Sequence, residues 1–212
     1  MKDMIYVFDL DGTLVDSMLG FAKGMLSVPD EEGIAYTDEL ISILTPLGYK
    51  GSAEYYVNNM GINDTVDNIV SRIQNKLVKE YSENIFTKPY VKEFLKKLHG
   101  EGARLFVLTA SPHIVTDVCL KHNGIYDLFE EVWSVDDYGL NKSGTELFFK
   151  VAERIGCAPA DVNYFDDHPT AILNAGKAGY RTYGVSDRQK PEVVELLKNI
   201  SDVFVSEYSE ML

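Results

Sequence analysis

"YVFDLDGTLVDS", residues 6–17, is the stretch of sequence that says most about the fold of this chain. It begins with apolar residues typical of a buried strand and ends with three aspartates, Asp9, Asp11 and Asp16. Asp9 and Asp11 are two positions apart in an extended segment, so they can point to one side, and Gly12 permits an abrupt turn after them. Converging carboxylates repel unless a cation lies between them or one holds a proton. The stretch therefore predicts a strand that directs two acids at one hard divalent cation such as Mg²⁺.

The composition limits what the chain can bind. Its 212 residues are 45% hydrophobic and 25% charged, which is typical of a globular protein with one large domain or a main domain and a small insert. The net charge of −13 argues against a nucleic-acid partner, although a local metal ion would still admit a small anionic substrate. Cys119 and Cys157 match neither a disulfide framework nor a metal motif. Without a long apolar run, we expect no membrane segment and a cytoplasmic location.

Strand-like and helix-like segments alternate along the chain from residue 86 onwards. Strands are predicted at 4–9, 104–109, 130–135, 162–167, 181–185 and 202–206. Helices are predicted at 85–102, 111–124, 143–156, 169–178 and 190–200. Such alternation is typical of βαβ units, so we expect an α/β fold with a Rossmann-like parallel sheet and helices on both faces.

The segment 16–85 does not follow this alternation. It carries helix-like patterns and no convincing strand, and within it 64–83 repeats apolar residues at helical spacing. We therefore predict two domains. One is an α/β core formed by 1–15 and 86–212, and the other is a small α-helical cap, 16–85, inserted after the first strand.

Polar side chains follow three of the predicted strands at the point where each strand ends. Asp9 and Asp11 follow the first strand, Thr109 follows the second, and Asp166 with Asp167 ends the fourth. Ligands bind to open α/β sheets at the carboxyl ends of the strands, so these side chains are expected to form one site. Each acid alone is better explained as a helix cap or a turn residue, and their joint occurrence at successive strand ends favours a site.

Four segments of the chain resemble motifs of the haloacid dehalogenase-like hydrolase superfamily, particularly its phosphatases with a helical cap. The four segments are "FDLDGTLVDS" (8–17), "VLTAS" (107–111), "GLNKSGTELF" (139–148) and "YFDDHPTAILNAGKAGY" (164–180). The resemblance covers nearly the whole chain; its first motif is highly specific, and the second and third count only in this order. It implies a Mg²⁺-dependent phosphatase that hydrolyses a small phosphorylated metabolite through an aspartyl-phosphate.

The resemblance implies roles for the three aspartates of the first and fourth motifs. Asp9 is the nucleophile that attacks phosphorus, and Asp11 protonates the leaving oxygen and then activates the hydrolytic water. Mg²⁺ would be held by the carboxylate of Asp9, the backbone carbonyl of Asp11 and Asp167.

The second and third motifs imply a phosphate-binding group. By resemblance, Thr109, Ala110 and Lys142 bind and neutralise the transferring phosphoryl group, because phosphoryl transfer depends on positioning and charge neutralisation. The helix that follows Thr109 is expected to have Ser111 as N-cap and Pro112 as first helical residue. Its backbone N–H groups would then face the site, which suits an anion.

The fourth motif departs from the family pattern at Ala171, where a second acid is common. The chain instead has an extra acid, Asp166, directly before Asp167. We expect Asp166 to take part of the missing role by holding either metal-bound water or Lys142. His168 could orient a metal ligand or cap the following helix, and we favour the cap.

"TPLGYKGSAEYY" (45–56) is the segment of the predicted cap that we expect to face the site. Gly48 and Gly51 would permit a tight bend, and Lys50 would supply a cation for substrate specificity. In the alternative, which stays open, the tyrosines of this segment pack in the core of the cap and Lys50 is solvated.

Three other functions are alternatives to the phosphatase. A phosphotransferase or phosphomutase, such as a beta-phosphoglucomutase-like enzyme, would use the same aspartyl-phosphate, and the sequence hardly distinguishes it from a phosphatase. A dehalogenase is disfavoured because displacing halide does not require the acid Asp11. Only the absence of a second acid at Ala171 favours a non-catalytic ligand-binding module. The sequence leaves open whether the substrate is a nucleotide, phosphoglycolate or a sugar phosphate, and whether the chain is a monomer or a homodimer.

Overall fold

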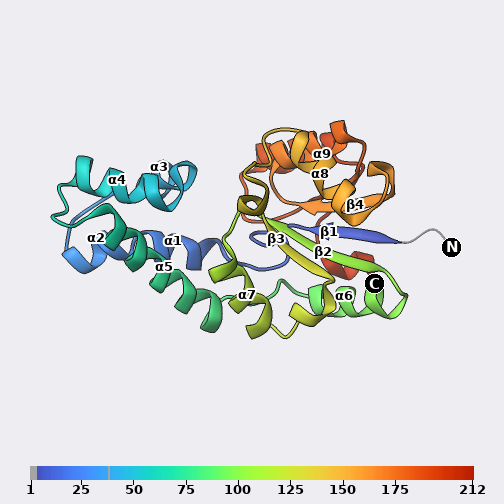
Figure 1. The fold of residues 1–212 in the computed structure, drawn as a ribbon, viewed down its shortest axis with the longest axis horizontal. Helices are drawn as coiled ribbons and strands as arrows, with labels where there is room; N and C mark the ends of the chain where they lie inside the picture. The colour runs from blue at the N-terminus through green and yellow to red at the C-terminus, as the bar shows by residue number, and fades with distance from the viewer. Residues whose placement is uncertain (1–3, 38) are drawn as a thin grey trace. The chain divides into compact units, whose positions relative to one another are not determined.

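The chain folds into two compact units in a computed structural model that describes residues 4–37 and 39–212 (Figure 1). The core unit comprises the residues up to Asp16 together with Phe86–Leu212, and the helical unit is Ser17–Ile85. The helical unit therefore begins one residue after the expected start at 16 and ends at the expected residue 85. Among the described residues, no helix is long and apolar enough to cross a membrane.

The core unit is built on a parallel sheet of six strands in the order β3-β2-β1-β4-β5-β6 (Figure 1). The strands are β1 (Ile5–Phe8), β2 (Arg104–Thr109), β3 (Glu131–Ser134), β4 (Val162–Asp166), β5 (Arg181–Val185) and β6 (Val203–Val205). Phe8 at the end of β1 pairs with Val107 of β2 and Phe165 of β4, so these strands end close together. The strand order reverses between β1 and β4, which is the switch point where such sheets bind ligands. The predicted α/β class and Rossmann-like sheet are confirmed.

Helices cover both faces of this sheet, as Figure 1 shows. The helices are α6 (Val91–Gly100), α7 (His113–His122), α8 (Glu146–Ile155), α9 (Pro169–Ala178) and α10 (Pro191–Ile200). The 3₁₀ turns are η2 (Tyr126–Leu128), η3 (Val135–Tyr138), η4 (Pro159–Asp161) and η5 (Tyr208–Met211). The helix expected from residue 85 begins only at Val91, because Thr87 pairs with Val15 in an isolated bridge and Tyr90 has a left-handed φ of 66°.

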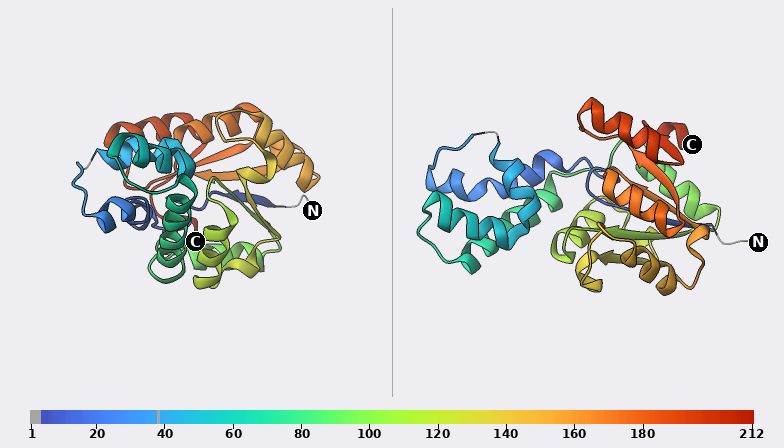
Figure 2. Two further views of the ribbon diagram at one scale, coloured as in Figure 1. Left: turned by 60° about the vertical axis from the view of Figure 1, so that its left-hand side comes forward. Right: turned by 90° about the horizontal axis from the view of Figure 1, so that it is seen from above.

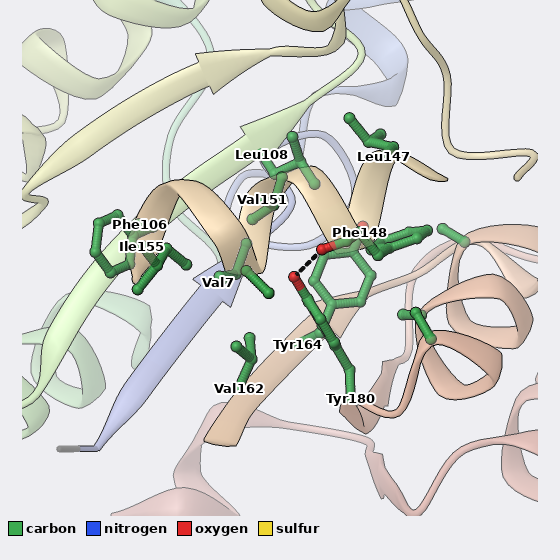
Figure 3. Packing of buried hydrophobic residues seen from close by; sticks show 14 of the residues in the cluster. Val7, Phe106, Leu108, Leu147, Phe148, Val151, Ile155, Val162, Tyr164 and Tyr180 are labelled. Atoms are coloured by element: carbon green, nitrogen blue, oxygen red, sulfur yellow. Dashed lines mark hydrogen bonds between the residues drawn. The ribbon is translucent and has the colours of Figure 1, made fainter. Parts of the chain in front are cut away.

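Alternate residues of each strand bury opposite faces of the sheet. On one face, Val7, Phe106 and Leu108 pack against α8 and α9 (Figure 3). Within this cluster the Tyr180 hydroxyl donates a 2.6 Å hydrogen bond to the Phe148 carbonyl, which satisfies its buried polar atom. The opposite face is aromatic, and the ring pairs there include Phe8–Phe94, Phe8–Phe165 and Phe165–Tyr208. Burying a large side chain contributes about 1.5–3 kcal/mol, so both layers hold the strand ends in place.

In the helical unit (Figure 2), the longest helix packs against three of the other helices. Its elements are α1 (Met18–Met25), α2 (Ser27–Glu32), α3 (Leu40–Leu44), η1 (Thr45–Leu47), α4 (Gly48–Met60) and α5 (Val66–Glu83). Helix α5 matches the apolar periodicity of the sequence and begins at Val66, after the N-cap Thr65, whose hydroxyl accepts a 3.2 Å hydrogen bond from the N–H of Asn68. Of the two glycines expected to permit a bend, Gly48 has a φ of +64° where η1 meets α4, whereas Gly51 lies with Lys50 inside α4, so a bend at Gly51 is wrong.

Candidate active site

Asp9 is placed by the sheet itself. It follows β1 directly, and its backbone N–H donates a 2.8 Å hydrogen bond to the carbonyl of Phe165, which continues the pairing of β1 with β4. Its side chain is buried, with 6% of the residue exposed, and Oδ1 accepts a 2.5 Å hydrogen bond from Nζ of Lys142. Because β1 pairs with both β2 and β4 and this hydrogen bond extends the second pairing, the carboxylate of Asp9 is preorganised at the switch point of the sheet.

Gly12 forms the turn that follows Asp11. Its φ of +75° lies in the left-handed region, and a Cβ there would lie 2.7 Å from Oδ2 of Asp167. A side chain at this position would therefore be strained and would collide with a carboxylate. The next residue, Thr13, donates from Oγ1 to Oδ1 of Asp167 at 3.4 Å. The turn thus brings the first motif into contact with the fourth.

Asp11 is held by the segment that follows β2. The hydroxyl of Ser111 donates a 2.6 Å hydrogen bond to Oδ2 of Asp11, and the N–H of Ser111 donates to Oγ1 of Thr109 at 3.1 Å. The expected cap at Ser111 is wrong, because Pro112 is the N-cap and α7 begins one residue later. Ser111 therefore orients the expected proton donor, a contact that the sequence analysis missed although its position after a strand end was a signal.

Lys142 joins Asp9 to Asp166. Its Nζ donates to Oδ1 of Asp9 at 2.5 Å and to Oδ2 of Asp166 at 2.8 Å, while Nδ2 of Asn174 donates to its backbone carbonyl at 3.1 Å. Burial alone would lower the pKa of Lys142, but the charges of Asp166 and Asp9 outweigh it and raise that pKa. The lysine is therefore a fixed positive charge at the expected phosphate position.

Asp166 is almost fully buried, with 1% exposed, and both of its carboxylate oxygens accept hydrogen bonds. Besides Lys142, the Tyr164 hydroxyl donates to Oδ2 at 2.5 Å and the N–H of His168 donates to Oδ1 at 2.7 Å. Asp166 was expected to hold either metal-bound water or Lys142, and the contact with Lys142 is present. His168 is confirmed as a helix cap, since its Nδ1 accepts from the N–H of Thr170 at 3.3 Å.

Asp9, Asp166 and Asp167 form an acidic cluster in which one oxygen of each lies within 4.8 Å of the others. Burial raises the pKa of Asp9 to about 7 against the lowering effect of Lys142, and Asp166 and Asp11 add to the rise. Burial, Asp166 and Asp9 also raise the pKa of Asp167 well above its usual range. Three acids around one lysine leave an excess of negative charge, and their hard oxygen atoms are the ligands that Mg²⁺ prefers.

Three other residues considered in the sequence analysis lie in different surroundings. Ala110 is exposed and follows Thr109 directly at the end of β2, so its backbone lies beside the site. Ala171 is 1% exposed and belongs to the apolar cluster beneath α9, where a carboxylate would be buried without a partner. Lys50 is an exposed residue of the helical unit, and its role in specificity stays a prediction.

Comparisons with known proteins agree with this geometry. The model of the family described as "Haloacid dehalogenase-like hydrolase" matches residues 6–185. A phosphorylated carbohydrates phosphatase of Thermotoga maritima is 24% identical over 84% of this chain and 83% of its own length. A phosphoglycolate phosphatase of Shigella dysenteriae is 28% identical over 88% of this chain and 86% of its own. The solved structure of a predicted phosphoglycolate phosphatase from Haemophilus somnus superposes with a TM-score of 0.81 at 21% identity, covering 100% of this chain and 97% of that one.

Proposed function

Because the chain belongs to the haloacid dehalogenase-like hydrolase family, we propose that it is a phosphatase that hydrolyses a phosphate monoester through an aspartyl-phosphate on Asp9. The observation that carries this is the setting of Asp9, a buried carboxylate at the switch point that is hydrogen-bonded to Lys142. The names of the two curated relatives, both phosphatases, support the reaction class.

The contacts of the site support a role for each residue in two chemical steps. In the first, a carboxylate oxygen of Asp9 bonds to phosphorus while the bond to the leaving oxygen breaks, and Asp11 gives that oxygen its proton. In the second, Asp11 takes a proton from water as the water oxygen bonds to phosphorus and the bond to Asp9 breaks. The 2.6 Å contact with Ser111 keeps Asp11 in place for both transfers. Lys142 and the Thr109 hydroxyl offset the charge on the phosphoryl oxygens.

Asp9, the backbone carbonyl of Asp11 and Asp167 would hold a Mg²⁺ ion, and Asp166 supports the site through its hydrogen bond from Lys142. The excess negative charge of the acidic cluster and the raised pKa values of Asp9 and Asp167 support a resident cation. When bound, Mg²⁺ neutralises charge on the transferring phosphoryl group.

The helical unit is the proposed cap, and a small phosphorylated metabolite is the proposed substrate. A helical insert of this size, joined to the core by two connections, suits a lid that excludes water from the reacting group. Lys50 is the proposed specificity residue of this unit, for the anionic part of the substrate that is not transferred. Sugar phosphates and phosphoglycolate, the substrates in the names of the curated relatives, are the first compounds to test.

A screen of phosphorylated metabolites tests this function. The wild-type chain and Asp9→Asn are each incubated with sugar phosphates, phosphoglycolate and nucleotides at millimolar Mg²⁺, and inorganic phosphate is measured. We expect release by the wild type alone. Analysis of the organic product separates hydrolysis from phosphoryl transfer between substrates. If no compound is hydrolysed, or if Asp9→Asn is as active as the wild type, the proposed function is wrong.

A further inference from the structure

Gln189, in the loop Ser186–Lys190 that joins β5 to α10, contacts Asp167 at two atoms. Its Nε2 donates to the backbone carbonyl of Asp167 at 3.0 Å and to the carboxylate Oδ2 at 3.3 Å. On the other side of the amide, Oε1 accepts a 2.6 Å hydrogen bond from the N–H of Asp187. A backbone N–H can only donate, so it must face Oε1, and this leaves the NH₂ group directed at Asp167. The loop thus presents a donor whose orientation is fixed by its own backbone.

Two ion pairs hold this loop to the rest of the core unit. Nζ of Lys88 contacts Oδ1 of Asp187 at 2.8 Å and the carbonyl of Ser186 at 2.7 Å, and both side chains of the pair are largely buried. Arg188 donates to both carboxylate oxygens of Asp16, at 3.0 and 2.6 Å. The Lys88–Asp187 pair is buried and the exposed Arg188–Asp16 pair is bidentate, and each feature makes a pair more restrictive than an ordinary surface contact. Gln189 is therefore held in place from both sides.

Asp167 has a particular need for such a donor. The Asp167 carboxylate lies beside those of Asp9 and Asp166, and it accepts hydrogen bonds from Oγ1 of Thr13 at 3.4 Å and from Nε2 of Gln189 at 3.3 Å. A neutral amide donor stabilises the charged form without adding another negative charge to the cluster.

We propose that Gln189 is a positioning residue for the metal site: it holds the carboxylate of Asp167 in the orientation that binds Mg²⁺. This rests on the proposed function. Gln189 acts through Asp167, as hydrogen-bond partners of metal ligands do, and loss of such a partner typically costs about 10–100-fold in metal affinity or activity.

The test compares Gln189→Met, which keeps the length of the side chain and removes the donor, with Gln74→Met, the same change on α5 of the helical unit. The half-saturating Mg²⁺ concentration is measured from phosphate release and, independently, from the rise of Tm with Mg²⁺. We expect Gln189→Met to raise this concentration about 10-fold or more in both assays, with kcat largely recovered at saturating Mg²⁺. Gln74→Met should behave as the wild type, and Gln189→Ala should reproduce the effect of Gln189→Met.

The outcomes separate the inference from the function on which it rests. If both Gln189 variants have a half-saturating Mg²⁺ concentration within about twofold of the wild type, Gln189 does not position Asp167, whatever happens to the metal-free Tm. That result would leave the proposed phosphatase intact. If instead the wild type neither releases phosphate nor responds to Mg²⁺ in Tm, the proposed function and this inference fail together.

Discussion

Both units of the chain bury acids, but they surround them in opposite ways. In the helical unit, Glu80 of α5 is 3% exposed, and its carboxylate lies 2.8 Å from Nζ of Lys23, 3.0 Å from Nδ2 of Asn84 and 3.7 Å from Nζ of Lys76. Burial would raise the pKa of Glu80, but these donors outweigh it and the pKa is lowered. One acid with several donors is balanced within the fold.

The acidic cluster of the core unit is not balanced. Asp9, Asp166 and Asp167 lie together, Lys142 pairs with the first two, and the pKa values of Asp9 and Asp167 rise instead of falling. Folding alone gains nothing from burying like charges side by side, so such a cluster is typical of a functional site. Burial alone therefore does not distinguish a structural acid from a functional one, whereas the ratio of acids to donors does.

The largest expected effect comes from removing the nucleophile from the unbalanced cluster. Asp9→Asn should lower phosphate release by more than about 10³-fold, because an amide cannot replace a covalent nucleophile. Its Tm in the absence of Mg²⁺ should not fall, because the substitution relieves repulsion. The matched control is Asp67→Asn on the exposed face of α5. Activity of Asp9→Asn above about one per cent of the wild type would contradict the assignment.

Asp167→Ala is expected to have the next largest effect, on the response to Mg²⁺. Binding of the ion to the folded chain should raise the Tm of the wild type by mass action. Without Asp167 the proposed site loses a charged ligand, so the rise in Tm should disappear at millimolar Mg²⁺. A melting curve of Asp167→Ala that shifts with Mg²⁺ as the wild type does would show that the cation is held elsewhere.

Asp166→Ala should be milder than Asp167→Ala. Both oxygens of Asp166 are already occupied by hydrogen bonds, among them that from Lys142, so we assign it to the support of the site. A loss of about 10–100-fold in activity or Mg²⁺ affinity is expected. Titrating Mg²⁺ against both variants decides the matter, because a kinetically silent Asp166→Ala would reduce its role to closing β4.

The strand ends could be predicted from the sequence because they depend on local pattern. Period-two and apolar runs located the strands, and the parallel topology then required Asp9, Thr109 and Asp166 to converge. The contact of Ser111 with Asp11 could not be predicted in this way, because it joins residues 100 positions apart and competes with an ordinary capping role. The same holds for Gln189 and Asp167, which are 22 positions apart in different loops.

The errors in the helical unit have a related cause. Gly51 was expected, with Gly48, to permit a tight bend, and a glycine inside a helix costs about 1 kcal/mol relative to alanine. In the structure it continues α4, because packing of neighbouring residues such as Ala53 and Tyr56 outweighs that cost. Local propensity is a weak guide where a short segment is stabilised mainly by tertiary contacts.

Lys50→Ala tests whether the helical unit also contributes to function. If Lys50 binds the part of the substrate that is not transferred, its loss should raise KM about 10-fold for the metabolite found in the screen. A small aryl phosphate, which lacks that part, should be hydrolysed almost as before. The matched control is Lys79→Ala, an exposed lysine of α5. Equal effects on both substrates would argue against recognition by Lys50.

The smallest expected effect is on the balanced acid. Glu80→Gln removes the charge but keeps the shape, and because Lys23 is 58% exposed the ion pair contributes little beyond its hydrogen bonds. We expect a loss of about 1 kcal/mol, or about 2–4 °C in Tm, with activity unchanged. Because the folded pKa lies below the ordinary value of 4.5, this contribution is present above that pH and is lost as the pH falls through the lowered pKa.

The difference in Tm between the wild type and Glu80→Gln should therefore shrink on acidification, whereas Glu83→Gln, at the exposed end of the same helix, should show no difference at any pH. The changes in Tm would then separate the two regions: neutralising Glu80 lowers the Tm, and neutralising Asp9 does not. If Glu80→Gln proved stabilising, the donors around Glu80 would be too weak to offset its burial, and the ratio of acids to donors would no longer separate the two regions.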